Sequence, residues 1–418
     1  MKRAFYFCLV LLILGSVSAF AAGSKASTAP SGPVTIEFFQ QKLEEGPQQA
    51  YKAVLDKFSA AYPQYHIEIN TVPQAGQVLT SRIVAGDIPP LFSDYPTQLQ
   101  FKEKVKNGFI YDLTGQSFLS RINKPALDLC KQQDGHDYAM PLTQNFMGVY
   151  YNIDIFNANG ISIPTSYDEL IAACKKLKAN GVQPFIFSFI DPGRVGHMFQ
   201  AWNAAWTPDG VERMAAVMNG TGTIANDPVM LKMAQRILEM VSYGNADAFS
   251  LPDMEGSWAG FANGKAAMLL MGSYARGTLL ISNPNIHMGV FPLPGDTDAT
   301  TTVIAGIDAA LCIAAGASAR EKEAALAYLE FLSRAENAQI FCNIEGAPNC
   351  VTAVDYPDKQ MAPIIEKVKR GPIHDWFAAS FPGNVMNAIY SDAQQFLMDK
   401  DPSKFLAQLQ QTIINESK

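Results

Sequence analysis

The sequence predicts an α/β fold, because strand-like and helix-like segments alternate along the chain from residue 34 onward. Residues 34–39 (VTIEFF) are rich in β-branched and aromatic side chains, as strands are. Residues 48–62 place apolar side chains at helical spacing and end before Pro63, and residues 66–70 alternate as a second strand. This βαβ unit predicts a parallel strand pair. At 418 residues the chain is long enough for two domains, so we expect two lobes.

The same alternation continues along the chain. Residues 148–152 read as a strand, and Ser166 is placed to cap a helix over 167–179, with Glu169 at the third position after the cap. Asn180-Gly181 is a good end for that helix. Further segments continue the α/β pattern: a strand at 185–189, amphipathic helices at 227–241 and 319–333, and two more helices within 391–415.

The N-terminus has the pattern of a secretion signal. Lys2 and Arg3 precede an apolar core over residues 5–14, and Ala19-Phe20-Ala21 gives a small-x-small cleavage pattern before Ala22. Cys8 lies inside the apolar core and not at the end of a lipid-attachment box, so we expect no acylation. The prediction is an exported protein, periplasmic or on the cell surface, with a signal peptide over residues 1–21 and a flexible Ser/Ala/Gly/Pro leader over 22–33.

Charge and composition argue against a nucleic-acid partner. The formal net charge of −7 becomes −9 once Lys2 and Arg3 are removed with the signal, and no polybasic run is present. Phosphate neutralisation by Lys and Arg supplies most nucleic-acid affinity, so we expect none. No segment after the signal is long and uncharged enough to be a transmembrane helix.

Five cysteines follow the predicted cleavage site. Cys342 and Cys350 are close in sequence and flank Gly346 and Pro348, which makes them the natural disulfide pair of an exported protein. The alternative, that both are buried free thiols packed as small apolar groups, has equal weight. The remaining three lie in apolar or helical contexts and are expected in the core: Cys130, Cys174 and Cys312.

Four stretches resemble motifs of the extracellular solute-binding proteins that supply sugars to ABC importers, the family 1 or maltose-binding-protein-like group. They are GDIPP at 86–90, VYYN at 149–152 continuing to PTSYDEL at 164–170, FANGKAAM at 261–268 with GSY at 272–274, and MGVFPLP at 288–294 followed by the helix from Lys322 to Ser333. Two positions depart from the family pattern, since Pro90 replaces the usual acid and Tyr274 stands where the family usually carries Trp.

The resemblance implies a two-lobe periplasmic-binding-protein fold in which the chain crosses between the lobes several times at a hinge. One lobe is then expected over 34–141 and 288–338, and the other over 142–287 and 339–418. The implied function is to bind a sugar or oligosaccharide between the lobes and deliver it to an ABC importer permease. The implied partners are therefore a saccharide and the permease, and we expect a monomer without a cofactor.

A saccharide site needs aromatic side chains for the apolar faces of the sugar rings and polar side chains for the hydroxyl groups. In the resembling fold such residues gather at strand ends and at loops facing the cleft, as in open α/β sheets generally. The four Trp residues all lie beside predicted loops. The predicted ligand-binding residues are Gln40, Gln41, Asp94, Tyr95, Gln144, Asn145, Trp202, Trp258, Tyr274, Asp308, His374, Asp375 and Trp376.

A secreted carbohydrate-active enzyme is the main alternative from another class. The 39 acidic residues guarantee that some carboxylate pair will be plausible, so pairs carry no information. The five histidines lack metal-site spacing, and neither a Gly-x-Ser-x-Gly elbow nor a Cys-x-x-Cys pair is present. We therefore predict no catalytic residues and no metal site.

A second alternative keeps the scaffold and changes the cargo to a polyol or a glycerol phosphate ester. An anionic ligand would need a cluster of Arg or Lys in the cleft. Arg194 and Arg276 are the only cations near the predicted cleft loops, so the sequence favours a neutral saccharide.

Overall fold

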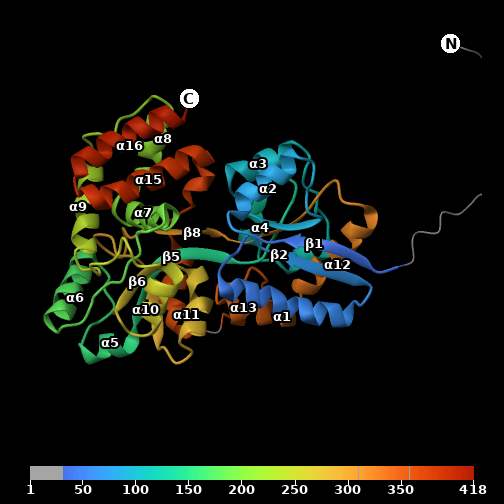
Figure 1. Cartoon of the computed structure of the whole chain (residues 1–418), viewed down its shortest axis with the longest axis horizontal. Helices are drawn as coiled ribbons and strands as arrows, with labels where there is room; N and C mark the ends of the chain where they lie inside the picture. The colour runs from blue at the N-terminus through green and yellow to red at the C-terminus, as the bar shows by residue number, and fades with distance from the viewer. Residues whose placement is uncertain (1–31, 309, 357) are drawn as a thin grey trace, which may run out of the picture.

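The computed structural model describes residues 32–308, 310–356 and 358–418. They form two lobes, each built on its own β-sheet with helices on both faces (Figure 1). The predicted signal peptide and most of the predicted leader lie outside the described residues.

The first lobe is built from the N-terminal part of the chain and from a later excursion. Its first segment contains β1 (Val34–Phe39), α1 (Glu45–Ala61), β2 (Tyr65–Asn70), α2 (Ala75–Val84), β3 (Leu91–Asp94), α3 (Leu99–Lys106), η1 (Ser117–Arg121), α4 (Lys124–Cys130) and β4 (Met140–Pro141). The excursion adds β9 (Ala310–Ile313), α12 (Ala319–Leu332) and α13 (Ala335–Glu345).

The second lobe takes the middle and the end of the chain. Its middle segment contains β5 (Gln144–Asn152), α5 (Ile153–Ala158), α6 (Tyr167–Ala179), α7 (Pro192–Trp206), α8 (Gly210–Met218), α9 (Pro228–Val241), η2 (Asp253–Trp258), α10 (Ala259–Ala262), β6 (Met268–Gly272), η3 (Ser273–Ala275), α11 (Arg276–Ser282), β7 (Met288–Phe291) and β8 (Val303–Ile307). The final segment adds η4 (Lys359–Met361), α14 (Ala362–Arg370), β10 (Ile373–His374), η5 (Phe377–Ala379), α15 (Gly383–Asp399) and α16 (Pro402–Glu416).

The first sheet has the strand order β2-β1-β3-β9-β4. β1 is parallel to β2, with Val34 opposite Tyr65, which confirms the strand pair predicted from the βαβ unit. β1 is also parallel to β3, whereas β9 runs antiparallel to β3 and β4. α1 and α13 run below β1 and β2 in Figure 1, and α2 and α3 lie above them. The carboxyl ends of β1 and β3 therefore meet at one edge of this sheet.

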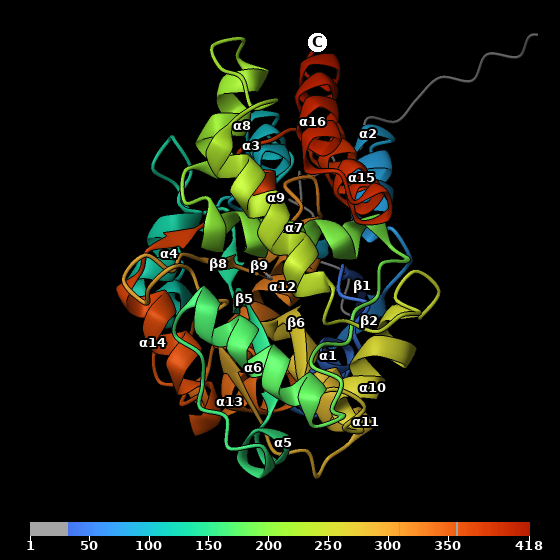
Figure 2. The same cartoon turned by 90° about the vertical axis from the view of Figure 1, so that its left-hand side faces the viewer.

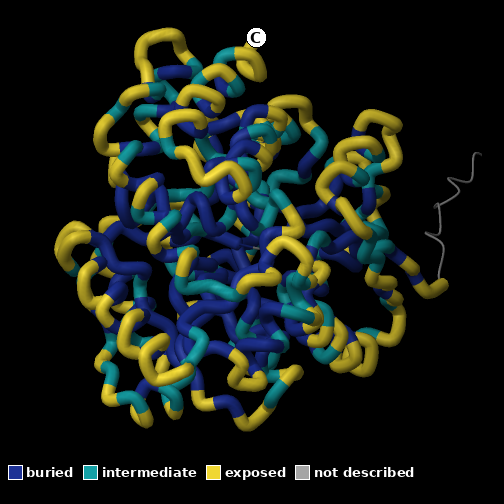
Figure 3. The backbone as a smooth tube through the Cα atoms, turned by 60° about the vertical axis from the view of Figure 1, so that its left-hand side comes forward, coloured by how far each residue is buried: buried dark blue, intermediate teal, exposed yellow. Residues whose placement is uncertain are grey.

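The second sheet has the order β10-β8-β5-β6, and β7 also pairs with β5. β5 is antiparallel to β6, β7 and β8, so this sheet is largely antiparallel. α7 and α15 lie above it in Figure 1, with α10 and α11 below. Figure 2 shows α8, α9, α15 and α16 gathered at one end of this lobe. β5, β6, β7 and β8 are almost entirely buried, and the exposed segments of the chain lie at the outside of the molecule (Figure 3).

The chain crosses between the two sheets at three places in the part that the structure describes. It passes from β4 to β5, from β8 to β9, and from the segment after α13 to η4. The first crossing comes immediately after Met140-Pro141. Several crossings side by side make a hinge, and Asp308 lies in the second of them.

Two of the three predicted lobe boundaries, at 287–288 and 338–339, differ from the boundaries that the strand pairing gives. β7 and β8 belong to the second sheet, so residues 288–307 do not join the first lobe. α13 packs on α1 to its end at Glu345, and Val351 still belongs to the first hydrophobic core, so the final crossing comes after 339. The antiparallel register of β5 with β7 is a long-range pairing that a local pattern does not reveal.

The helices predicted from local signals agree closely with the structure, whereas one predicted strand is wrong. Ser166 accepts a hydrogen bond from the Glu169 N–H and α6 has the predicted bounds, with Gly181 at φ +74° after its end. Residues 185–189 are not a strand: Phe185 makes only an isolated bridge to Met268. The Phe187 N–H donates instead to the Asn245 side chain, because this stretch pairs with the loop after α9.

All five cysteines in the described residues are buried free thiols. The predicted Cys342–Cys350 disulfide is therefore wrong in this structure, and the packing alternative holds. Cys342 lies within α13 and its thiol donates to the Ala347 carbonyl at 3.4 Å, away from Cys350. Burial raises the pKa of both thiols, so neither has thiolate character.

Within the described residues no helix has the length and apolar character needed to cross a membrane.

Candidate functional site

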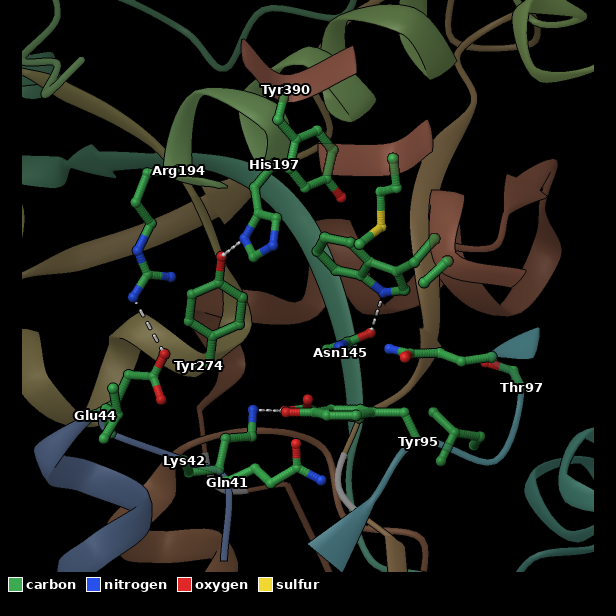
Figure 4. Close-up of a pocket in the computed structure, with 17 residues that line it drawn as sticks. Gln41, Lys42, Glu44, Tyr95, Thr97, Asn145, Arg194, His197, Tyr274 and Tyr390 are labelled. Atoms are coloured by element: carbon green, nitrogen blue, oxygen red, sulfur yellow. Dashed lines mark hydrogen bonds and ion pairs between the residues drawn. The ribbon is translucent and has the colours of Figure 1, made fainter. Parts of the chain in front are cut away.

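A cavity of about 310 Å³ lies between the two lobes, beside the hinge. Its lining side chains come from both lobes and from the second crossing (Figure 4). A volume near 300 Å³ is at the small end of the range for small-molecule sites. Both lobes must therefore contribute to any complex formed here.

The first lobe contributes a polar wall, which we define as Gln41, Lys42, Glu44, Tyr95, Thr97 and Gln98. These residues follow β1 and β3, whose carboxyl ends lie at the same edge of the sheet. Gln41 is fixed to the neighbouring strand: its backbone N–H donates to Ser93 Oγ at 2.9 Å, and its side-chain amide donates to the Ser93 carbonyl at 2.6 Å. The polar wall is thus held by hydrogen bonds between adjacent strand ends.

The second lobe contributes an aromatic wall, which we define as His197, Tyr274, Trp376 and Tyr390. His197 lies among the other three, with ring centroids 6.1 Å from Tyr274, 5.1 Å from Trp376 and 6.2 Å from Tyr390. These residues come from α7, η3, the turn before η5, and α15, and Figure 4 shows His197 between Tyr274 and Tyr390. Packing between distant elements therefore assembles this wall.

Two glycines make the aromatic wall possible. A side chain at Gly272 would meet the Tyr274 ring at 2.1 Å, so only glycine lets this ring fold back over the end of β6. A side chain at Gly196 would meet the Tyr390 ring at 2.1 Å, so glycine at this position lets the ring pack directly on α7. Gln200 on the next turn of α7 then donates to the Tyr390 hydroxyl at 2.7 Å.

Trp376 and Asn145 form a polar contact within the second-lobe wall. The Trp376 indole N–H donates to Asn145 Oδ1 at 2.7 Å, as the dashed line in Figure 4 shows. Asn145 lies on β5 directly after the first crossing, so the orientation of the indole is tied to the hinge. The hydrogen bond also occupies the only polar atom of the indole and leaves its carbon faces for contact with a ligand.

The charges at the cavity are paired with one another. Lys42 forms a buried ion pair with Asp308, and Arg194 pairs with Glu44 at 3.3 Å and with Asp253 at 2.7 Å. Burial lowers the pKa of Lys42, but Asp308 and the nearby acids outweigh it and raise the pKa overall. Burial likewise raises the pKa of Glu44, but Lys42 and Arg194 outweigh it and lower the pKa overall. Lys42 and Glu44 are therefore charged at neutral pH.

His197 is neutral in this setting. Burial lowers its pKa to about 3, and the positive charge of Arg194 acts in the same direction. Nδ1 of His197 is 2.9 Å from the Tyr274 hydroxyl, and burial raises the pKa of that hydroxyl to about 12. Both groups are uncharged hydrogen-bonding partners at neutral pH, and the pair fixes the Tyr274 ring.

The structure places some of the predicted site residues in the cavity wall. They are Gln41, Tyr95, Asn145, Tyr274, Asp308 and Trp376. Their predicted role in binding stays a prediction, whereas their convergence on one cavity is an observation.

The tryptophans Trp202 and Trp258 do not line the cavity, which corrects their prediction. Trp202 is 1% exposed and lies in the hydrophobic core, on a face of α7 turned away from His197. Trp258 is fully buried behind Tyr274, with ring centroids 6.2 Å apart. Both were expected at the site because they lie near loops, but burial in the core decides their role.

Three predicted residues of strand ends lie beside the cavity wall and shape the chain there. Gln40 is buried and its amide donates to the Lys42 carbonyl at 2.7 Å. Asp94 is buried and pairs with Lys104 at 2.6 Å. Gln144 donates its backbone N–H to the Pro348 carbonyl at 2.8 Å, in the hinge.

The two residues before Trp376 also miss the cavity wall. The ring of His374 is hydrogen-bonded to the Pro208 carbonyl. Asp375 accepts a hydrogen bond from the Trp376 backbone N–H at 2.7 Å, and burial raises the pKa of its carboxyl group. Asp375 thus supports the turn that presents Trp376.

The predicted binding residues omit several residues of the cavity wall, including Lys42, Glu44, Arg194, His197 and Tyr390. Arg194 was expected near the cleft but not as a site residue, and Lys42 is a cation of the cleft that the sequence analysis overlooked. Lys42 and Glu44 follow the same strand end that predicted Gln41, so the strand-end rule could have included them. Arg194 and His197 share one face of α7 at a spacing of three residues, which is a weak signal. Tyr390 carries no local signal, because α15 reaches the site only through packing on α7.

No metal site accompanies the cavity in the described ranges, since no group of His, Cys, Asp and Glu there is arranged to hold a metal ion. The arrangement offers aromatic faces, neutral hydrogen-bonding groups and internally paired charges between two lobes. Its chemistry is that of reversible binding of a small polar solute.

Comparison with known proteins agrees with the fold and identifies the family. A family model described as bacterial extracellular solute-binding protein matches residues 42–339. The multiple sugar-binding protein of Streptococcus mutans is 27% identical over 364 residues, covering 82% of each chain. The melibiose/raffinose/stachyose-binding protein MelE of Bacillus subtilis is 21% identical over 367 residues, covering 85% of this chain and 82% of MelE.

A solved structure shares the architecture. The solute-binding protein RafE in complex with raffinose superposes with a TM-score of 0.82 at 21% identity, covering 92% of this chain and all of that one. At this identity the likeness shows the fold: two lobes on separate sheets, with the chain crossing between them.

Proposed function

Because this chain belongs to the bacterial extracellular solute-binding proteins, we propose that it binds a neutral sugar or oligosaccharide in its interlobe cavity and delivers it to an ABC importer permease. The family is one of binding proteins and not of enzymes. To family membership the proposal adds the class of solute, a neutral sugar, and the transport partner, an ABC importer permease.

The observation that carries the proposal is the pairing of an aromatic wall on one lobe with a polar wall on the other. Sugar rings present apolar C–H faces that pack on aromatic rings, and hydroxyl groups that both donate and accept hydrogen bonds. Trp376 supplies the first kind of surface, and Gln41 and Asn145 supply the second. The Tyr274 ring lines the same cavity and lies at cation–π distance from Lys42 and Arg194. A ligand that touches both walls favours the closed arrangement of the lobes, because only that arrangement allows both contacts.

The balance of charge supports a neutral ligand. Each cation at the cavity already has a carboxylate partner: Lys42 has Asp308, and Arg194 has Glu44 and Asp253. An anionic group would have to displace one of these carboxylates and leave it partly buried without a partner, which is costly. A phosphate ester or uronic acid is thus disfavoured.

The relatives support an oligosaccharide. One carries the name multiple sugar-binding protein, another is named for melibiose, raffinose and stachyose, and a structural neighbour holds raffinose. We propose a small neutral oligosaccharide for this chain as well. Its contacts would be the six predicted residues in the cavity wall, together with Lys42, Glu44, His197 and Tyr390.

The proposal also covers the export of the protein and its oligomeric state. We propose that the signal is cleaved before Ala22 without acylation, and that the mature chain works as a monomer in the periplasm or at the cell surface. The permease would then receive the solute from the closed form. Family membership and the N-terminal pattern support this placement.

Isothermal titration calorimetry tests the proposal. Mature protein is titrated with raffinose, with a neutral disaccharide, and with a uronic acid and a sugar phosphate of matched size. We expect saturable binding of a neutral sugar and none of the anions, with the saccharide recovered unchanged. Binding of an anion alone would contradict the neutral assignment, and consumption of the saccharide would show an enzyme.

A further inference from the structure

Arg194 is the only residue of the cavity wall, among those described, that forms ion pairs with both lobes. Its Nε is 2.7 Å from Asp253 Oδ2, in the second lobe, and its Nη2 is 3.3 Å from Glu44 Oε1, in the first lobe. Figure 4 shows the guanidinium reaching down from α7 toward Glu44. One side chain therefore joins the two halves of the cleft.

Arg194 is anchored to the second lobe. Its guanidinium carbon lies 5.2 Å from the Trp258 ring centroid and 5.5 Å from that of Tyr274, which are cation–π distances. α7, η2 and η3 all belong to this lobe, so these contacts and the Asp253 pair move together when the lobes separate. Arg194 therefore travels with the aromatic wall.

Glu44 is anchored to the first lobe. It immediately precedes α1 and is buried at 8% exposure. The neighbouring Lys42 and Arg194 outweigh its burial and keep its carboxyl group ionised, because they lower its pKa. When the lobes separate, Glu44 loses Arg194.

The two carboxylate partners of Arg194 therefore differ in whether they keep their ion pair when the cleft opens. Asp253 keeps its cation in either state, so opening leaves no unpaired guanidinium. Glu44 has the cation only while the lobes are together. We propose that Arg194 is a positioning residue whose pair with Glu44 latches the closed cleft, and that competition from Asp253 keeps this latch weak enough to open. The inference rests on the proposed function only in that the cleft closes on a solute.

The distance between the lobes tests this latch without any saccharide. Spin labels are placed at Val84→Cys on α2 and Met398→Cys on α15, two exposed positions on different lobes (Figure 1). The five cysteines among the described residues are buried and stay unlabelled in folded protein. Pulsed electron paramagnetic resonance then gives the ratio of short to long interlobe distances.

The two carboxylates should shift this ratio in opposite directions. Glu44→Gln should lower the closed-to-open ratio about threefold to tenfold, because it removes one ion pair whose cation is shared with Asp253. Asp253→Asn should raise the ratio, because Arg194 then has its carboxylate partner only in the closed state. Glu45→Gln, which removes an exposed carboxylate one residue away, should leave the ratio unchanged.

A second variant guards against a purely structural effect of Glu44. Arg194→Met should also lower the ratio, and adding Glu44→Gln to it should lower the ratio no further, because the pair is already broken. Shifts of the same sign for Glu44→Gln and Asp253→Asn, or additive effects in the double variant, would overturn the latch. A confirmed latch in a protein that binds no sugar would refute the proposed solute alone.

Discussion

The two walls of the cavity differ in which segments of the chain supply their residues and in which interactions hold them. The polar wall lies in two short segments that follow β1 and β3, and hydrogen bonds to neighbouring strand ends fix it. The aromatic wall draws its residues from α7, η3, α15 and the turn before η5, and close helix packing fixes it. Local pattern therefore predicts the first wall better than the second, and substitutions should affect the two walls differently.

The largest effect should come from the charge buried in the polar wall. Lys42→Met leaves Asp308 buried without a partner, so the free energy of unfolding should fall by about 3–5 kcal/mol. Urea denaturation measures it. Replacing both partners, as in Lys42→Met with Asp308→Leu, should restore most of the loss, because no unpaired charge remains.

Lys52→Met is the matched control for Lys42. Lys52 pairs with Asp56 at 2.7 Å on the exposed face of α1, where an ion pair contributes little. We expect a far smaller change in stability than for Lys42. Equal effects of the two substitutions would show that burial does not govern the Lys42 pair.

The next effect separates two tryptophans that the sequence did not distinguish. Trp376→Ala removes an aromatic face of the cavity and should weaken saccharide binding by about 2–4 kcal/mol. Trp202→Ala leaves a cavity in the core and should lower the free energy of unfolding by about 3–5 kcal/mol, while the folded protein binds normally. Calorimetric titration and thermal unfolding of each variant measure the two effects. A stable Trp202 variant with lost affinity would move Trp202 back into the site.

The smallest effect is a pH dependence of stability that originates in the aromatic wall. The pKa of His197 is about 3 in the folded protein and near 6.5 in the unfolded chain. Between these values the unfolded chain binds a proton that the folded protein does not, so stability falls as the pH falls. One such group contributes a slope of about 1.4 kcal/mol per pH unit below pH 6.5.

His197→Gln should remove this slope. The free energy of unfolding is measured by urea denaturation at pH 7.5, 6 and 5, and the difference between wild type and variant should change across the series. His66→Gln, at an exposed position on β2, serves as the control and should leave the slope as it is. A slope that survives in the His197 variant would place the proton uptake at another group.

The range of the interactions involved explains which of the predicted residues lie in the cavity wall. Gln41 and Tyr95 were found because a strand end is a local feature, and Tyr274 because the GSY motif marks it. Lys42 was overlooked because its partner, Asp308, lies 266 residues further along the chain. When the partner is unknown, the local sequence does not distinguish a buried, paired lysine near a strand end from a solvated one.

The lobe boundaries show the same limit. The predicted boundaries were those that the family resemblance implied, and the structure has a crossing after Met140-Pro141. The crossings near Asp308 and after α13 were misplaced, because they depend on β7 and β8 pairing with β5 and on α13 packing against α1. Pairing across a sheet leaves little trace in the paired segments themselves.

By itself the sequence determined the parallel β1–β2 pair and the capped helix α6, because each depends on residues within one to three neighbouring elements. It also determined the α/β class and the family resemblance, because these depend on patterns that each segment carries locally and that recur along the chain. Only the tertiary structure decided which tryptophan faces the cavity, that the cysteines are free thiols, and that Arg194 joins Asp253 to Glu44. These outcomes depend on which side of an element faces the other lobe. That orientation is set by the packing of segments far apart in the chain.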